Sequence, residues 1–130
     1  MNRMAEWICV AAGGALGSVL RYGSGIWLQP FFGDRLPWVT PMVNALGSLV
    51  AGIIWALCLR SSVIGAPTGT IYYFGLVGFC GGFTTFSAFS RELFLLLQNE
   101  HYPHALLYIL LSIGGGIVGF WLGLRLLSAQ

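Results

Sequence analysis

The chain alternates four long apolar segments with short polar connections. The apolar segments cover residues 7–28, 38–59, 71–97 and 105–124, and the connections carry charges, prolines and glycines. At roughly 1.5 Å per residue, each segment is long enough to cross a hydrocarbon core of about 30 Å. The pattern therefore predicts an all-α membrane protein with one domain, residues 1–130, four transmembrane helices and both termini on the same side.

The third segment contains a stretch that hydrophobicity does not explain. Residues 78–90 hold three glycines, two threonines, two serines and four phenylalanines, where a spanning helix normally carries leucine and valine. Gly81 and Gly82 weaken a helix, and nearby hydroxyls can bind the backbone groups that a break would free. We therefore expect the third helix to be broken near the membrane midplane, where freed carbonyls favour a cation and a new helix N-terminus favours an anion.

Composition excludes a water-soluble domain. Hydrophobic residues make up 57% of the chain and charged residues 8%, whereas soluble domains carry about 25% charged residues. The net charge of +2 comes from six arginines without any lysine, which is too small and scattered for a nucleic-acid surface. Cys9, Cys58 and Cys80 lie in apolar runs without metal-ligand spacing, so we interpret them as small buried hydrophobes.

Arginine positions do not select one orientation in the membrane. Three arginines fall on the side of the termini and three on or toward the other side; they are Arg3, Arg60 and Arg125, and Arg21, Arg35 and Arg91. The positive-inside rule then favours neither orientation. Either the count is too small to be informative, or the chain inserts both ways and two opposite copies form an antiparallel, dual-topology homodimer.

Small-xxx-small glycine pairs predict close helix contacts. The pairs are Gly13 and Gly17, Gly78 and Gly82, Gly115 and Gly119, and Gly119 and Gly123. Such pairs let membrane helices approach closely. Because four short spans offer little interior for a polar pathway, we interpret the pairs as support for oligomerisation.

Several polar and aromatic residues allow two interpretations. Asn44 either joins two helices or donates to a passing anion, because an unpaired amide in hydrocarbon is costly. Arg21 either lines a wet vestibule or extends to the membrane surface. Glu92 either marks the interface or lines the mouth of a pathway. Phe86 and Phe89, three apart on one helical face, either turn their positive edges toward an anion or form a packed core.

Three motifs together resemble the Fluc (CrcB-type) fluoride channels of bacteria. They are Gly-Gly-x-x-Gly followed by Arg-Tyr at residues 13–22, Asn-Ala-Leu-Gly-Ser at residues 44–48, and Gly-Phe-Cys-Gly-Gly-Phe-Thr-Thr-Phe-Ser-Ala-Phe at residues 78–89. The resemblance covers essentially the whole chain, and the third motif is highly specific in a four-span protein of this length. Within this third motif, the chain has Ala88 where many relatives have threonine.

The resemblance implies a role for individual residues. An antiparallel homodimer would contain two fluoride pores and a sodium ion on its two-fold axis, held by the backbone carbonyls of Gly81 and Thr84 from both subunits. Tyr108 and Ser112 would supply a track of hydroxyls on the fourth helix. The residues assigned to the fluoride pore are Asn44, Phe86, Phe89, Thr85, Ser87, Tyr108, Ser112, Thr40, Glu92 and Arg21.

The sequence thus predicts passive, fluoride-selective export across the bacterial plasma (inner) membrane. The alternative is a small dual-topology multidrug or cation exporter, which needs a carboxylate in the middle of the membrane. Glu6 and Glu92 lie near helix ends and Asp34 lies in a connection, so this alternative is disfavoured. A structural subunit would not need the polar third helix. An enzyme is not expected, because no nucleophile and base pair or metal cluster is apparent.

Overall fold

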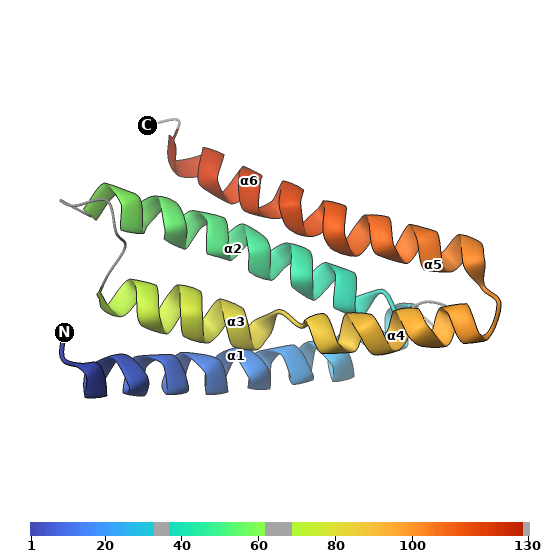
Figure 1. Ribbon diagram of the computed structural model, residues 1–130, viewed down its shortest axis with the longest axis horizontal. Coiled ribbons are helices and arrows are strands. Elements are labelled where there is room, and N and C mark those ends of the chain that lie inside the picture. Colours follow the sequence, from blue (N-terminus) through green and yellow to red (C-terminus); the bar gives the residue numbers. More distant parts are fainter. Residues whose placement is uncertain (33–36, 62–68, 129–130) are drawn as a thin grey trace.

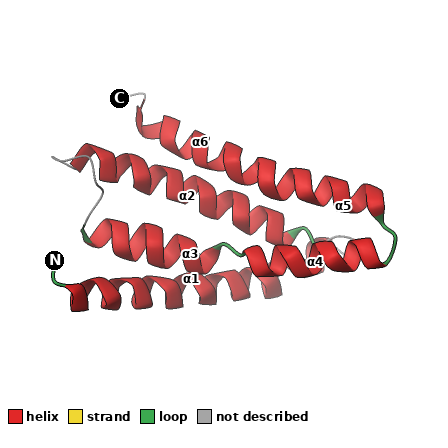
Figure 2. Cartoon of the chain, in the orientation of Figure 1, coloured by secondary structure: helices red, strands yellow, loops and turns green. Residues whose placement is uncertain are grey.

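The computed structural model describes residues 1–32, 37–61 and 69–128, and every regular element in these ranges is helical (Figure 2). Four rods run side by side (Figure 1). The first is α1 (Arg3–Phe32), and the second is α2 (Val39–Ser61). The third contains η1 (Ile71–Cys80), α3 (Gly81–Phe83) and α4 (Phe86–Gln98), and the fourth contains α5 (Tyr102–Ile109), η2 (Leu110–Gly114) and α6 (Gly115–Ser128).

The rods pack as two close pairs. Helix α1 lies along η1 and α3, and helix α2 lies along α6. The start of α1 and the end of α6 lie at the same end of the bundle (Figure 1), which agrees with the four-segment pattern. Segments η1 and η2 are wider π-helical turns, a form that often occurs at functional sites.

Within the described residues, three helices are long and apolar enough to cross a membrane. They are Val39–Arg60, Ile71–Gln98 and Tyr102–Leu127, with mean hydropathies of 2.0, 1.2 and 2.0. Helix α1 carries Arg3, Glu6 and Arg21 and is not among the three. Large apolar side chains are exposed along all four rods, as expected for surfaces that lie in lipid. The protein is therefore a multi-pass membrane protein.

Glycine makes the close pairing of the helices possible within one chain. A methyl group added at Gly13 or Gly17 would overlap backbone atoms of Phe74 or Phe79 in the third rod. Likewise, groups added at Gly119 and Gly123 would overlap the backbone of α2. Our interpretation of these pairs as support for oligomerisation was therefore wrong, because the small surfaces are already covered by a neighbouring helix of the same chain.

Two prolines lie inside helices that were predicted to end before Pro30 and to begin after Pro103. Helix α1 continues through Pro30 to Phe32, because a proline this close to the end removes only one backbone hydrogen bond. Pro103 lies in the first turn of α5, where its missing N–H has no helical partner to lose. His104 is thus helical and not part of a loop. The predictions that concern Asp34, Arg35 and the connection over residues 62–68 lie outside the described residues.

Candidate functional site

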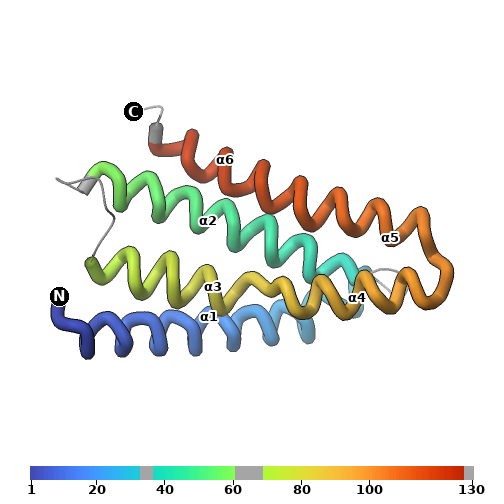
Figure 3. Tube along the Cα trace, in the orientation of Figure 1, coloured from blue at the N-terminus to red at the C-terminus, as the bar shows by residue number. Residues whose placement is uncertain are grey.

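The third rod changes backbone conformation between Phe83 and Phe86. Thr84 has φ −79° and ψ 159°, and Thr85 has φ −149° and ψ 122°, so both residues are extended. The chain trace correspondingly opens between α3 and α4 (Figure 3). Extended residues cannot continue the helical pattern of hydrogen bonds, so the backbone groups on both sides need other partners.

Asn44 of α2 supplies two of these partners. Its Nδ2 donates to the Thr85 carbonyl at 3.1 Å, and the Thr85 N–H donates to its Oδ1 at 2.8 Å. The amide therefore pairs with one residue as another peptide group would. The helix-joining interpretation of Asn44 is confirmed by this contact. The second proton of Nδ2 has no partner among the described residues, so donation to an anion stays a prediction.

Three further side chains complete the hydrogen bonding around the extended residues. Arg21 of α1 donates from Nε to the Gly82 carbonyl at 3.0 Å. Thr84 donates from its hydroxyl to the Cys80 carbonyl at 2.8 Å. The Thr85 hydroxyl accepts from the Ala88 N–H at 3.2 Å and thereby caps α4. The extended residues are thus held by α2 and by their own rod, and α1 binds Gly82 in the helical turn just before them.

These hydrogen bonds divert donors away from two carbonyls. In a continuous helix, the Thr85 N–H would bond to Gly81 and the Ala88 N–H would bond to Thr84. Here the first N–H bonds to Asn44 and the second to the Thr85 hydroxyl. The carbonyls of Gly81 and Thr84 are left without their helical donors. Freed carbonyls of this kind are suitable ligands for a hard cation.

The two predicted pore phenylalanines contact each other but differ in exposure. Their ring centroids are 5.5 Å apart with planes inclined by 38°. Phe86 is 78% exposed in the single chain, whereas Phe89 is 7% exposed. The Phe89 ring stacks on the Tyr108 ring at 5.4 Å. Phe89 is thus part of the core between α4 and α5, and Phe86 faces outward from it.

A cluster of polar side chains surrounds the Tyr108 hydroxyl. The Tyr108 hydroxyl donates to Glu92 Oε2 at 2.6 Å, and Glu92 Oε1 lies 3.5 Å from Nη2 of Arg91. Buried Thr40 and Ser112 also lie close to this hydroxyl. The Ser112 Oγ nevertheless has no hydrogen-bond partner among the described residues. An unpaired buried hydroxyl is costly, so this atom is a candidate donor to a ligand.

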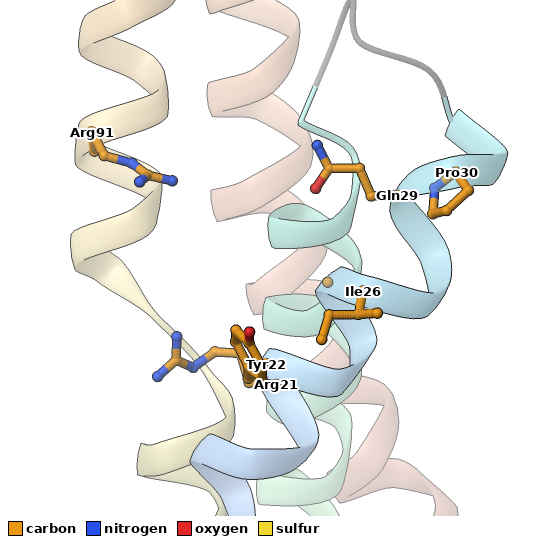
Figure 4. A pocket seen from close by; sticks show the side chains of 7 residues that line it. Arg21, Tyr22, Ile26, Gln29, Pro30 and Arg91 are labelled. Carbon is orange, nitrogen blue, oxygen red and sulfur yellow. The ribbon is translucent and has the colours of Figure 1, made fainter.

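Two cavities lined by described residues border the site. One of about 230 Å³ is lined by Thr40, Glu92 and Arg91 with neighbouring apolar residues. The other, of about 830 Å³, lies between α1 and α4 and is lined by Arg21, Tyr22, Gln29 and Arg91 among others (Figure 4). Arg21 therefore borders a cavity, and its Nε is held by the Gly82 carbonyl.

The predicted residues fall into two groups. Asn44, Thr84, Thr85 and Arg21 meet at the extended residues, whereas Thr40, Glu92, Tyr108 and Ser112 gather beside Phe89. Ser87 is exposed, and its hydroxyl lies 3.3 Å from that of Thr85. The sequence did not predict that Arg21 binds the Gly82 carbonyl. It also did not predict that Arg91 lines both cavities. No local signal could have identified the first, because the two partners are 61 positions apart.

Comparison with known proteins gives a family over nearly the whole chain. A family model described as "CrcB-like protein, Camphor Resistance (CrcB)" matches residues 8–124. A "Fluoride-specific ion channel FluC" of Thermus thermophilus is 48% identical over 121 residues, which cover 93% of this chain and 92% of the relative. Proteins of the same name from Leptospira interrogans and Rhizobium meliloti are 41% and 38% identical, and cover 94% and 98% of this chain and 97% and 99% of their own. The resemblance inferred from the motifs is thus confirmed, and the chain belongs to the CrcB family.

Proposed function

We propose that this protein is a fluoride-selective channel that lets fluoride leave the bacterial cell passively across the plasma membrane and so relieves fluoride toxicity. The observation that carries the proposal is the near-complete coverage by relatives named as fluoride-specific ion channels. The geometry is compatible with conduction, because the candidate site offers neutral donors, aromatic rings and backbone groups beside the charged side chains of Arg21 and Glu92.

The proposed pore runs along the unpaired donors. The residues assigned to it are Asn44, Phe86, Phe89, Thr85, Ser87, Tyr108, Ser112, Thr40, Glu92 and Arg21. Moving a small ion into a medium of low dielectric constant carries an idealised cost of about 20 kcal/mol, so a narrow pore must replace the water that fluoride loses. The free proton of Asn44 and the buried Ser112 hydroxyl can donate without a fixed charge, which allows the ion to bind and then leave.

The exporter alternative is not favoured by the placement of the carboxylates. Within the described ranges, Glu6 lies in the first turn of α1 and Glu100 lies in the turn between α4 and α5. Glu92 accepts from Tyr108 and lies beside Arg91. A proton-coupled pump needs a carboxylate that is free to exchange protons within the membrane.

We further propose that two copies pair in opposite orientations, with α1 as the fourth span. The balanced arginine count supports insertion in both directions. In the single chain, Phe86 is largely exposed and Gly81 has open space around it, which supports a second copy on this face. The pairs of glycines elsewhere do not bear on this proposal, since they pack within the chain.

A sodium ion on the two-fold axis would complete this assembly. The Gly81 and Thr84 carbonyls, which lack their helical donors, would hold it from each copy. Carbonyl oxygens suit a hard cation, and one chain alone provides too few of them. The ion would supply positive charge that joins the two copies, while Asn44 and Thr85 hold the carbonyls in the required conformation.

Fluoride flux tests the proposed function directly. Liposomes that hold the purified protein and potassium fluoride should release fluoride rapidly once valinomycin lets potassium leave and so balances the charge of the departing fluoride. A fluoride electrode follows the release. Chloride should remain inside over the same period. Ser112→Ala should reduce flux by about tenfold or more, because it removes an unpaired donor.

Ser90→Ala is the matched control for the serine substitution. The Ser90 hydroxyl donates to the Phe86 carbonyl of its own helix, so its removal should leave flux within about twofold. Absent fluoride release, or chloride release at the same rate, would contradict the channel proposal. Equal flux in the two serine variants would remove Ser112 from the pore.

Labelling of engineered cysteines tests the assembly. In a background without the three native cysteines, a single cysteine at Met1 should react with an impermeant reagent from both sides of the membrane, because half of the copies point each way. Replacing sodium by a large organic cation should also lower the thermal midpoint of the dimer. Labelling from one side alone would exclude dual topology, and a midpoint independent of sodium would exclude the proposed ion site.

A further inference from the structure

Gly47 of α2 lies directly against the point where the third rod becomes extended. A methyl group added to Gly47 would overlap Cγ2 of Thr84 and lie 3.1 Å from Cδ1 of Phe83. Gly47 is buried and follows Asn44 by three positions, so both lie on the same face of α2. Asn44 pairs with Thr85. One face of α2 therefore contacts both extended residues, and the proposed pore assigns nothing to Gly47.

The contact at Gly47 differs from the contacts that pair whole helices. The glycines in those contacts meet backbone atoms of a neighbouring rod; they include Gly13, Gly17, Gly52, Gly119 and Gly123. Gly47 instead meets two side chains, those of Phe83 and Thr84, where α3 ends. Its small size therefore affects how these two side chains are placed, and not only how closely two helices approach.

Thr84 cannot turn its methyl group away from Gly47 without losing a hydrogen bond. Its hydroxyl donates to the Cys80 carbonyl at 2.8 Å. Because the hydroxyl and the methyl group share one carbon, a rotation that moves the methyl group to another staggered position also moves the hydroxyl. The Phe83 ring is held as well, since it stacks on Phe79 with centroids 5.8 Å apart and planes inclined by 6°. Thr84 thus has one side-chain conformation that satisfies both contacts.

The contacts of α2 also determine where the Thr84 carbonyl points. This carbonyl shares a peptide group with the Thr85 N–H, which donates to Asn44 Oδ1 at 2.8 Å. In a planar trans peptide group the C=O points opposite to the N–H, so the Thr84 carbonyl points away from Asn44. Its helical donor, the Ala88 N–H, bonds to the Thr85 hydroxyl instead. Asn44 therefore fixes one side of this peptide group, and Gly47 fixes the other by accommodating the Thr84 side chain.

We propose that Gly47 is a positioning residue for the cation site, because the space that it leaves for Thr84 Cγ2 holds the Thr84 carbonyl in the conformation that a cation needs. The inference rests on the proposed sodium site and assigns a second residue of α2 to it, beside Asn44. A methyl group at position 47 pushes Thr84 away from α2, turns its carbonyl and weakens the binding of sodium.

Thermal unfolding of the full chain in uncharged detergent, without fluoride and with sodium chloride exchanged for the salt of a large organic cation, tests the inference. The rise of the thermal midpoint with sodium concentration gives the dissociation constant of sodium. Gly47→Ala should raise this constant about tenfold or more. Gly52→Ala is the matched control in the same helix, since its methyl group would overlap the Phe120 carbonyl oxygen of α6. It should lower the midpoint at every sodium concentration but leave the dissociation constant within about twofold.

Adding Thr84→Ser to Gly47→Ala separates this contact from a general loss of packing. Serine keeps the hydroxyl and the carbonyl but lacks Cγ2, so the methyl group at position 47 can take its place. The dissociation constant of sodium should return to within about threefold of that of the unmodified protein. If Gly47→Ala alone does not fold, the double variant still decides, because it should fold and bind sodium.

The outcomes distinguish this inference from the proposals on which it rests. If the unmodified protein responds to sodium, an unchanged dissociation constant in Gly47→Ala or no recovery in the double variant would overturn the inference alone. If the midpoint of the unmodified protein does not depend on sodium, the ion site and the inference are both wrong. The fluoride channel proposal is tested separately by flux, since this experiment contains no fluoride.

Discussion

Asn44→Ala is expected to lower fluoride flux at least tenfold and to lower the thermal midpoint of the protein. The substitution removes both hydrogen bonds to Thr85 and leaves that residue's N–H and carbonyl without partners. Each unpaired buried group costs about 1–3 kcal/mol. It also removes the amide proton proposed to donate to fluoride. Flux from liposomes and thermal unfolding in detergent measure the two effects separately.

Asn99→Ala is the matched control for this substitution. The Asn99 amide also donates to a backbone carbonyl, that of Leu95 at 2.8 Å, but it is exposed at the end of α4. Water can replace that bond, so flux and thermal midpoint should hardly change. If Asn44→Ala behaves like Asn99→Ala in both measurements, Asn44 neither holds the extended residues nor serves the pore.

Gly123→Ala is expected to destabilise the pairing of α2 with α6. A methyl group at this position would overlap the Leu49 carbonyl oxygen and lie 2.9 Å from the Ile53 nitrogen. Backbone atoms cannot turn aside as a flexible side chain can, so the helices must separate. Overpacking of this kind costs about 1–3 kcal/mol. The thermal midpoint in detergent should fall accordingly, even though alanine favours a helix more than glycine does.

Gly114→Ala separates packing from helix propensity. Gly114 ends η2 in the same rod, and an added methyl group there meets no atom within 4 Å. Alanine in helices is more favourable than glycine by about 1 kcal/mol, so this variant should be as stable as the unmodified protein or slightly more so. Equal stability of the Gly114 and Gly123 variants would show that the α2 and α6 contact does not depend on glycine.

Most of the fold could be predicted from the alternation of apolar segments and polar connections. The segment limits predicted for the third rod, residues 71–97, nearly match the helical range Ile71–Gln98. The first and fourth rods were predicted too short at both ends, and one end of each was misplaced because Pro30 and Pro103 were treated as helix ends. A proline excludes one hydrogen bond, and whether that ends a helix depends on the turn in which it lies.

The residues of the candidate site could be predicted from the sequence, but the contacts between them could not. Asn44 was correctly identified as an amide that needs a partner, but Thr85 could not be named as that partner from the sequence. Gly81 and Thr84 were assigned to a cation by resemblance, and the diversion of their helical donors gives that assignment a physical reason. Glycine pairs suggested contact between chains, although the contacts lie within one chain.

The sequence determines what depends on neighbouring residues and on the solvent, namely helical segments of membrane length and polar groups that cannot remain unpaired in lipid. Gly81 and Gly82, which were expected to weaken the helix, are themselves helical, and the extended residues are Thr84 and Thr85. The tertiary structure decides which groups meet, because Asn44 and Thr85 are 41 positions apart and Arg21 and Gly82 are 61 apart. Their contacts depend on how closely whole helices approach. The small-xxx-small glycine pairs correctly predicted close contacts between helices, but they did not say which helices would meet.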